Sequence, residues 1–139
     1  MFEEEDYNTS RVKLDKEFQE SQACSIFELQ VILTDKKNKM SKSQNIINNP
    51  VFSKTLEYTE RFNKYGIVED FDKGAQKALR IKNILGNANL DKDEHSVIIN
   101  LLPMKVEEAF GLMPSLREKI SEDEMQTCLD ELIKQSKIN

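Results

Sequence analysis

Helix start and stop signals recur along this chain and restrict it to a mainly helical fold. Three segments place a serine or aspartate three positions before a glutamate, a pattern that caps free backbone N–H groups at a helix start. The three pairs are Ser25 with Glu28, Asp91 with Glu94, and Ser121 with Glu124. Asn49 followed by Pro50 predicts a fourth start. Glycine or proline is expected to end helices at Gly66, Gly86, Pro103 and Pro114.

These signals predict about six short helices in one domain. We expect the first helix at residues 25–34 and the second at 50–65, where an apolar stripe recurs at spacings of four and three and should face the core. The stripe consists of Val51, Thr55, Tyr58, Phe62 and Tyr65, and Phe52 and Leu56 widen it. Lys54 and Arg61 fall away from it and should be exposed. Core positions are also expected in the later helices, at Ala75, Ala78, Leu79, Leu85, Val97, Ile98, Leu101, Leu102, Val106, Ala109, Phe110, Met113, Met125, Cys128, Leu129, Leu132 and Ile133.

The segment RVKLDKEF, residues 11–18, has the pattern of a β-strand instead. Val12 and Leu14 alternate with charged residues, and no second run of this kind follows. Ordering the segment costs on the order of 10 kcal/mol, whereas burying Val12, Leu14 and Phe18 returns about 5–9 kcal/mol. Because backbone hydrogen bonds must supply the rest, we expect this strand to add to the sheet of another protein.

The helix at 25–34 is apolar around most of its circumference, so we expect it to be covered on two sides. The segment after it has no periodicity and clusters four lysines, Lys36, Lys37, Lys39 and Lys42. The expected organisation is therefore an arm for docking on a partner (residues 1–33), a flexible lysine-rich loop (34–49) and a helical domain (50–139). Whether the loop contacts RNA or an acidic partner, or is simply solvated, is left open by the sequence.

Composition excludes several classes of function. The formal net charge is −5 and the pI is near 5.0, which argues against independent binding to DNA or RNA. No apolar run reaches the roughly 18–20 residues that a membrane span needs. The acidic start of the chain does not resemble a signal peptide, so a cytosolic or nuclear location is expected.

No catalytic or metal-binding constellation is recognisable. The single histidine, His95, has no cysteine or second histidine near it in sequence. Cys128 lies on an expected apolar face and Cys24 lacks a histidine partner, so both thiols are expected to be buried. We therefore expect a protein without catalytic residues, cofactor, bound metal or small-molecule substrate. Its function should lie in binding other macromolecules.

Two blocks of sequence resemble the fourth subunit of eukaryotic RNA polymerase II. The first is VFSKTLEYTERF, residues 51–62, in which Lys54, Leu56, Tyr58, Arg61 and Phe62 match the signature helix of that family. The second is LDKDEHSVIINLLPMKVEEAFGLMPSL, residues 90–116, with matches that include Asn100, Pro103 and Pro114. The resemblance extends over almost the whole chain and is weakest at residues 66–89.

The resemblance implies a helical domain of the HRDC-like type in a nuclear, non-catalytic polymerase subunit. Members of this family pair permanently with the seventh polymerase subunit and form a stalk beside the RNA exit channel and against the clamp. On this basis we expect the partner interface to be formed by the arm and first helix, through Val12, Leu14, Phe18, Ile26, Phe27, Leu29, Gln30 and Leu33. Whether the chain also makes a weak contact with nascent RNA is not decided by the match.

Three alternatives remain at the level of sequence. The chain could be the corresponding subunit of RNA polymerase III or of an archaeal polymerase. It could be a free-standing HRDC-like module that binds nucleic acid, although its acidic balance speaks against this. An enzyme is the weakest alternative, because no set of residues supports one.

Overall fold

The computed structural model describes residues 16–42, 49–86 and 88–137, and these form a helical protein. The elements are α1 (Lys16–Glu20), α2 (Ile26–Lys42), α3 (Pro50–Phe62), α4 (Phe71–Ile84), α5 (Lys92–Leu101), α6 (Val106–Leu112), the 3₁₀ helix η1 (Pro114–Glu118) and α7 (Glu122–Lys137). The described residues contain no β-strand. None of these helices combines the length and the apolar character that crossing a bilayer would need.

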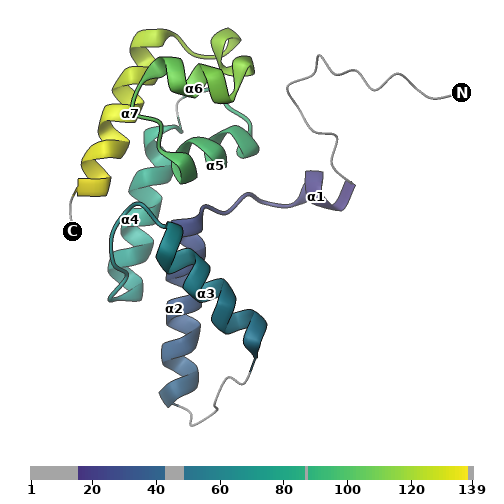
Figure 1. Cartoon of the computed structure of the whole chain (residues 1–139), viewed down its shortest axis with the longest axis vertical. Helices are drawn as coiled ribbons and strands as arrows, with labels where there is room; N and C mark the ends of the chain where they lie inside the picture. The colour runs from purple at the N-terminus through teal and green to yellow at the C-terminus, as the bar shows by residue number, and fades with distance from the viewer. Residues whose placement is uncertain (1–15, 43–48, 87, 138–139) are drawn as a thin grey trace, which may run out of the picture.

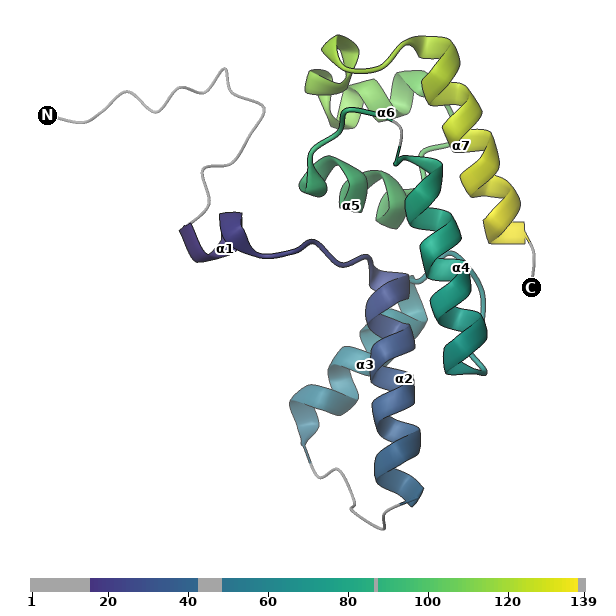
Figure 2. The ribbon, with the colours of Figure 1, turned by 180° about the vertical axis from the view of Figure 1, so that it is seen from behind.

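The helices form two connected groups along the long axis of the molecule (Figure 1). The pair α2 and α3 occupies one end, and α5, α6, η1 and α7 occupy the other. Helix α4 links the groups, because it packs against α2 on one side and α7 on the other. Figure 2 shows the same arrangement from behind.

The predicted caps begin their helices as expected. The Asn49 side chain accepts a hydrogen bond from the backbone N–H of Val51 at 3.0 Å, and Asp70 does the same for Asp72 at 3.2 Å. Reciprocal capping boxes form at Asp91 with Glu94 and at Ser25 with Glu28. The helix starts could therefore be read from local side-chain chemistry alone.

A single hydrophobic core joins the two groups of helices. It includes residues of α2, the turn after α3, and helices α4 to α7, namely Phe27, Val31, Tyr65, Val68, Ala78, Ile81, Leu85, Ile98, Ile99, Val106, Ala109, Phe110, Leu116, Ile120, Met125, Leu129 and Leu132. Two expected core residues, Leu79 and Leu101, are exposed instead. Each lies on the solvent side of its helix, while Ala78 and Ile81 in α4 and Ile98 and Ile99 in α5 take the inward positions.

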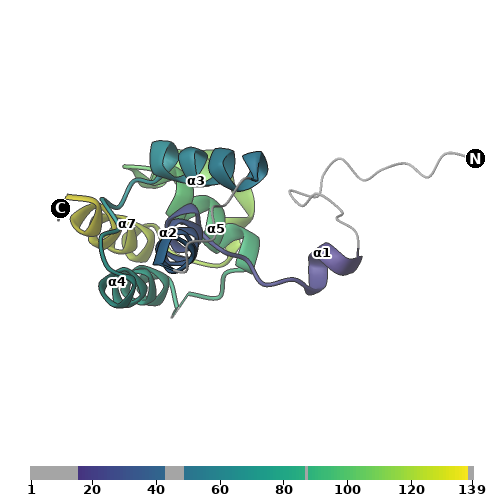
Figure 3. The ribbon, with the colours of Figure 1, turned by 90° about the horizontal axis from the view of Figure 1, so that it is seen from below.

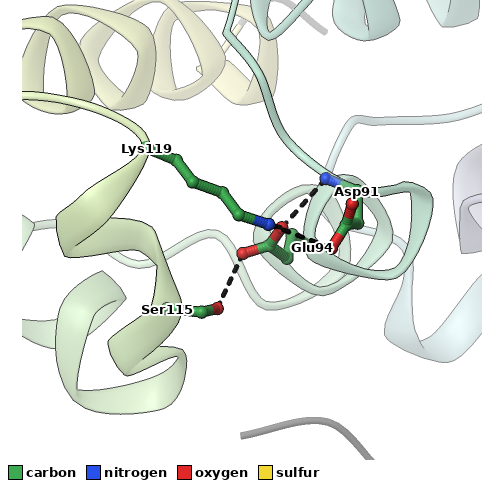
Figure 4. A network of polar contacts seen from close by, with 4 residues as sticks. All are labelled: Asp91, Glu94, Ser115 and Lys119. Carbon is green, nitrogen blue, oxygen red and sulfur yellow. Dashed lines mark hydrogen bonds and ion pairs between the residues drawn. The ribbon is translucent and has the colours of Figure 1, made fainter.

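A buried polar network fastens the start of α5 to the segment before α7 (Figure 4). The Glu94 side chain is almost fully buried, and it accepts a hydrogen bond from Ser115 at 2.8 Å and forms an ion pair with Lys119. Lys119 also pairs with Asp91 at 2.9 Å. The network thus compensates the Glu94 charge inside the protein.

Three expectations about the N-terminal third need correction. Residues 16–18 of the expected strand lie in α1, a helix, while residues 11–15 lie outside the described part of the chain. Helix α2 does not end at Thr34 but continues to Lys42, where exposed lysines are tolerated and Lys39 pairs with Asp35 at 2.9 Å. The expected lysine-rich loop is therefore helical over residues 35–42. Because Phe27 and Val31 lie in the common core, α2 belongs to the helical body.

Candidate partner interface

The outer face of α3 carries an exposed apolar stripe, formed by Val51, Tyr58 and Phe62. Their side chains are 70%, 55% and 47% exposed. The rings of Tyr58 and Phe62 pack against each other with centroids 4.6 Å apart, and the Arg61 guanidinium lies 5.6 Å from the Phe62 ring centre. Two exposed aromatic rings that pack against each other at a tilt of 43° form a preformed apolar surface.

The structure rotates the inward face of α3 relative to the expected stripe, toward the edge that contains Leu56. The prediction placed Val51, Tyr58 and Phe62 in the core, but Leu56 and Thr59 take the inward positions. Thr59 can be buried because its hydroxyl donates to the backbone carbonyl of Leu56 at 2.7 Å. The helix therefore carries two neighbouring stripes of suitable residues, and the one that contains Leu56 and Thr59 faces inward.

Tyr65, the last residue of the expected stripe, lies beyond the end of α3. The chain turns after Phe62, and Gly66 adopts a positive φ of 98°. This turn directs the Tyr65 ring into the core, where it meets the Phe27 ring edge-on at 5.9 Å. Its hydroxyl donates to the backbone carbonyl of Ile99 at 2.6 Å. Burial raises the pKa of Tyr65 above its usual range.

The expected interface residues of α2 divide between two sides of the helix. Phe27 and Gln30 are buried within the chain, and Gln30 accepts a hydrogen bond from the Asn63 side chain at 2.7 Å. Ile26, Leu29 and Leu33 are half-buried. Val12 and Leu14 lie outside the described residues, and Phe18 lies in α1.

In the signature helix, the structure separates residues that face solvent from one that supports the fold. Lys54 and Arg61 are exposed as expected, together with Tyr58 and Phe62, whereas Leu56 is buried. The exposed set therefore lies on one helix, and it combines two aromatic rings with cationic side chains.

Sequence reasoning missed two asparagines that organise this region. Asn63 joins the end of α3 to α2, and its side chain also bonds the backbone at Tyr65 and Gly66. Asn100 accepts a hydrogen bond from the backbone N–H of Ile26, the first residue of α2, at 2.9 Å. Asn100 matched the family pattern, but no local sequence signal indicates a contact 74 residues away.

Burial shifts the pKa values of the two cysteines and the single histidine. Burial raises the pKa of Cys24, and the Glu28 carboxylate raises it further; burial also raises the pKa of Cys128. Both thiols are therefore poor nucleophiles at neutral pH. Burial lowers the pKa of His95, and Lys82 adds to this effect. Within the described residues, no group of three or more His, Cys, Asp or Glu side chains is placed to hold a metal ion.

Comparisons with known proteins agree with the sequence blocks. A family model described as RNA polymerase Rpb4 matches residues 23–135. "DNA-directed RNA polymerase II subunit 4" of Arabidopsis thaliana is 31% identical over 122 residues, which cover 84% of this chain and 81% of the relative. "DNA-directed RNA polymerase II subunit rpb4" of Dictyostelium discoideum is 36% identical over 88 residues, which cover 63% of this chain and 52% of the relative.

The family match includes every helix from α2 to η1 and most of α7. It also contains the exposed stripe of α3 and the two asparagines that hold α2 in place. This chain therefore belongs to the Rpb4 family, the fourth subunits of RNA polymerase II.

Proposed function

We propose that this chain is a non-catalytic, nuclear subunit that pairs with the seventh subunit of RNA polymerase II. The pair forms the stalk near the RNA exit channel and the clamp, and there it supports initiation and engages transcription factors and the emerging transcript. The observation that carries this proposal is the exposed Tyr58–Phe62 pair on α3. A subunit that works only within an assembly needs such a surface, because burying exposed apolar side chains against a partner lowers the free energy of the complex.

The interface in this proposal differs from the one expected from sequence. Its centre is the stripe of α3, and the N-terminal arm with Val12, Leu14 and Phe18 forms a second contact. Phe27 and Gln30 act from inside, because they hold α2 against the turn that follows α3. Tyrosine and arginine are the residue types most often found at the energetic centre of protein interfaces.

Co-expression of the full chain with the seventh subunit tests the stripe. Tyr58→Ala combined with Phe62→Ala should weaken the pair at least about tenfold, because each aromatic anchor at an interface centre typically contributes about 2 kcal/mol or more. Leu112→Ala on α6 is the matched control, since Leu112 is 51% exposed and thus as accessible as the stripe. Equal affinities for all variants would remove the stripe from the interface.

Binding of single-stranded RNA is a second candidate for the same face. Exposed aromatic rings beside Lys54 and Arg61 could stack bases. The net charge of −5 disfavours this function for the chain alone. Titration of the isolated chain with a labelled single strand at low and high salt distinguishes the two candidates. Salt-sensitive binding that Tyr58→Ala abolishes would favour RNA over a protein partner.

A further inference from the structure

Residues 21–25 connect α1 to α2 without regular secondary structure, and we refer to them as the strap. Side chains of α5 hold the strap at both ends. Lys92, in the first turn of α5, donates to the backbone carbonyl of Ser21. Asn100, in the last turn, accepts from the backbone N–H of Ile26, where α2 begins.

The positions of these two contacts define the direction of the strap. Lys92 and Asn100 lie eight residues apart on one helix, which corresponds to about 12 Å along its axis. The five Cα–Cα steps from Ser21 to Ile26 can span at most about 18 Å, so the strap is long enough to connect the two contacts. It therefore runs along α5 in the same direction as that helix, from its first turn to its last.

Beyond the strap, α1 stands apart from the helical body, as Figures 1 and 3 show from two directions. Lys16, Glu17 and Glu20 of α1 are exposed. A five-residue helix has little stability of its own, so its position depends on the segment that attaches it. That segment is the strap.

We propose that Asn100 and Lys92 are positioning residues for partner binding, because they fix where the N-terminal arm leaves the body. This inference rests on the proposed pairing with the seventh subunit. When the strap is held along α5, the arm is attached at the N-terminal end of that helix. This attachment restricts the positions from which the arm can contact a partner. A free strap would let the arm swing from the start of α2, and ordering it would then cost free energy at each binding event.

The test is a double-variant cycle on the affinity for the seventh subunit. Asn100→Ala in the full chain should weaken binding about three- to tenfold, comparable to the loss of one hydrogen bond. In a chain that lacks residues 1–20, the same substitution should leave the affinity unchanged, because no arm remains to be positioned. A merely structural effect of Asn100 would weaken both forms equally.

Two further variants make the result specific. Asn100→Asp keeps an oxygen that accepts from the Ile26 N–H and should restore most of the affinity. Lys92→Met removes the other contact and should weaken binding only when the arm is present. If the wild-type chain binds and Asn100→Ala binds equally well with the arm present, the inference is wrong while the pairing stands. If the wild-type chain does not bind, the pairing and the inference are both wrong.

Discussion

Tyr65 and Tyr58 lie seven residues apart and have opposite surroundings. Tyr65 is 2% exposed and its hydroxyl bonds the Ile99 carbonyl, whereas Tyr58 is 55% exposed. A period of 3.6 residues places both on one face of an uninterrupted helix, and this is why the sequence predicted a shared stripe. The break after Phe62 rotates Tyr65 away. Helical periodicity could not reveal this break, because the turn after Phe62 depends on the contact of the Asn63 side chain with α2.

The Tyr65 hydroxyl should make stability sensitive to alkaline pH. Its pKa is raised in the folded protein, so its contribution is complete below its usual pKa of about 10 and is lost as the pH rises through the folded value. Tyr65→Phe should lower the free energy of unfolding by about 1–2 kcal/mol at pH 7, because the Ile99 carbonyl loses its partner. Above pH 10 the variant should lose stability less steeply than the wild type. Urea unfolding at a series of pH values measures both effects.

Two glycines allow a test of how closely α4 and α2 pack. A Cβ at Gly74 would lie 3.0 Å from a methyl carbon of Val31, whereas a Cβ at Gly111 would meet nothing within 4 Å. Gly74→Val should therefore destabilise the protein by about 1–3 kcal/mol through overpacking between α4 and α2. Gly111→Ala should raise the free energy of unfolding by up to about 1 kcal/mol, because alanine is the better helix former. Equal effects at the two sites would contradict the close packing.

At the scale of elements, caps were predictable and helix faces were not. Asn49 and Asp91 begin their helices as expected, because each cap is a local bond between residues two or three apart. The continuation of α2 to Lys42 was missed because a polar helical extension carries no apolar period. Which of two neighbouring stripes of α3 faces inward depends on the fit to α2, and a single sequence does not record that fit.

The network at the start of α5 should be a strong contributor to the stability of the second group of helices. Lys119→Met would leave the buried Glu94 carboxylate without its cation and should cost on the order of 2 kcal/mol. Glu94→Gln in the same chain should recover part of this loss, because the uncompensated charge is gone. Denaturant unfolding of the single and double variants measures the coupling. Additive losses would show that the pair does not act as a unit.

At the scale of the whole molecule, the core residues and the surfaces proposed to contact a partner lie in different parts of the chain. Helix α2, the turn after α3 and helices α4 to α7 share one core, while α1 lies outside it. The division into arm, loop and helical domain therefore shifts, with α2 joining the helical body. A partner could be expected from sequence, but the contact surface proposed here could not, because the stripe of α3 was assigned to the core.

Removal of residues 1–20 should separate these two properties. The free energy of unfolding should change by less than about 0.5 kcal/mol, because this deletion removes none of the described core residues. Affinity for the seventh subunit should fall, since the arm supplies the second contact. Thermal melts and binding titrations on the truncated chain report the two quantities separately. A truncated chain that melts far below the wild type would mean that the arm packs on the body.

One consequence of the strap is practical. Of the two cysteines in the chain, Cys24 was expected to be buried but lies within the strap and is exposed, because the strap crosses the surface of the helical body. Cys128 is half-buried with its Sγ 3.5 Å from the Ile84 carbonyl oxygen. A maleimide fluorophore should therefore react first at Cys24, at mildly alkaline pH because the raised pKa of this thiol slows the reaction at neutral pH. The unmodified sequence thus carries its own attachment point for a dye, at the place where the arrival of a partner would change the dye's brightness.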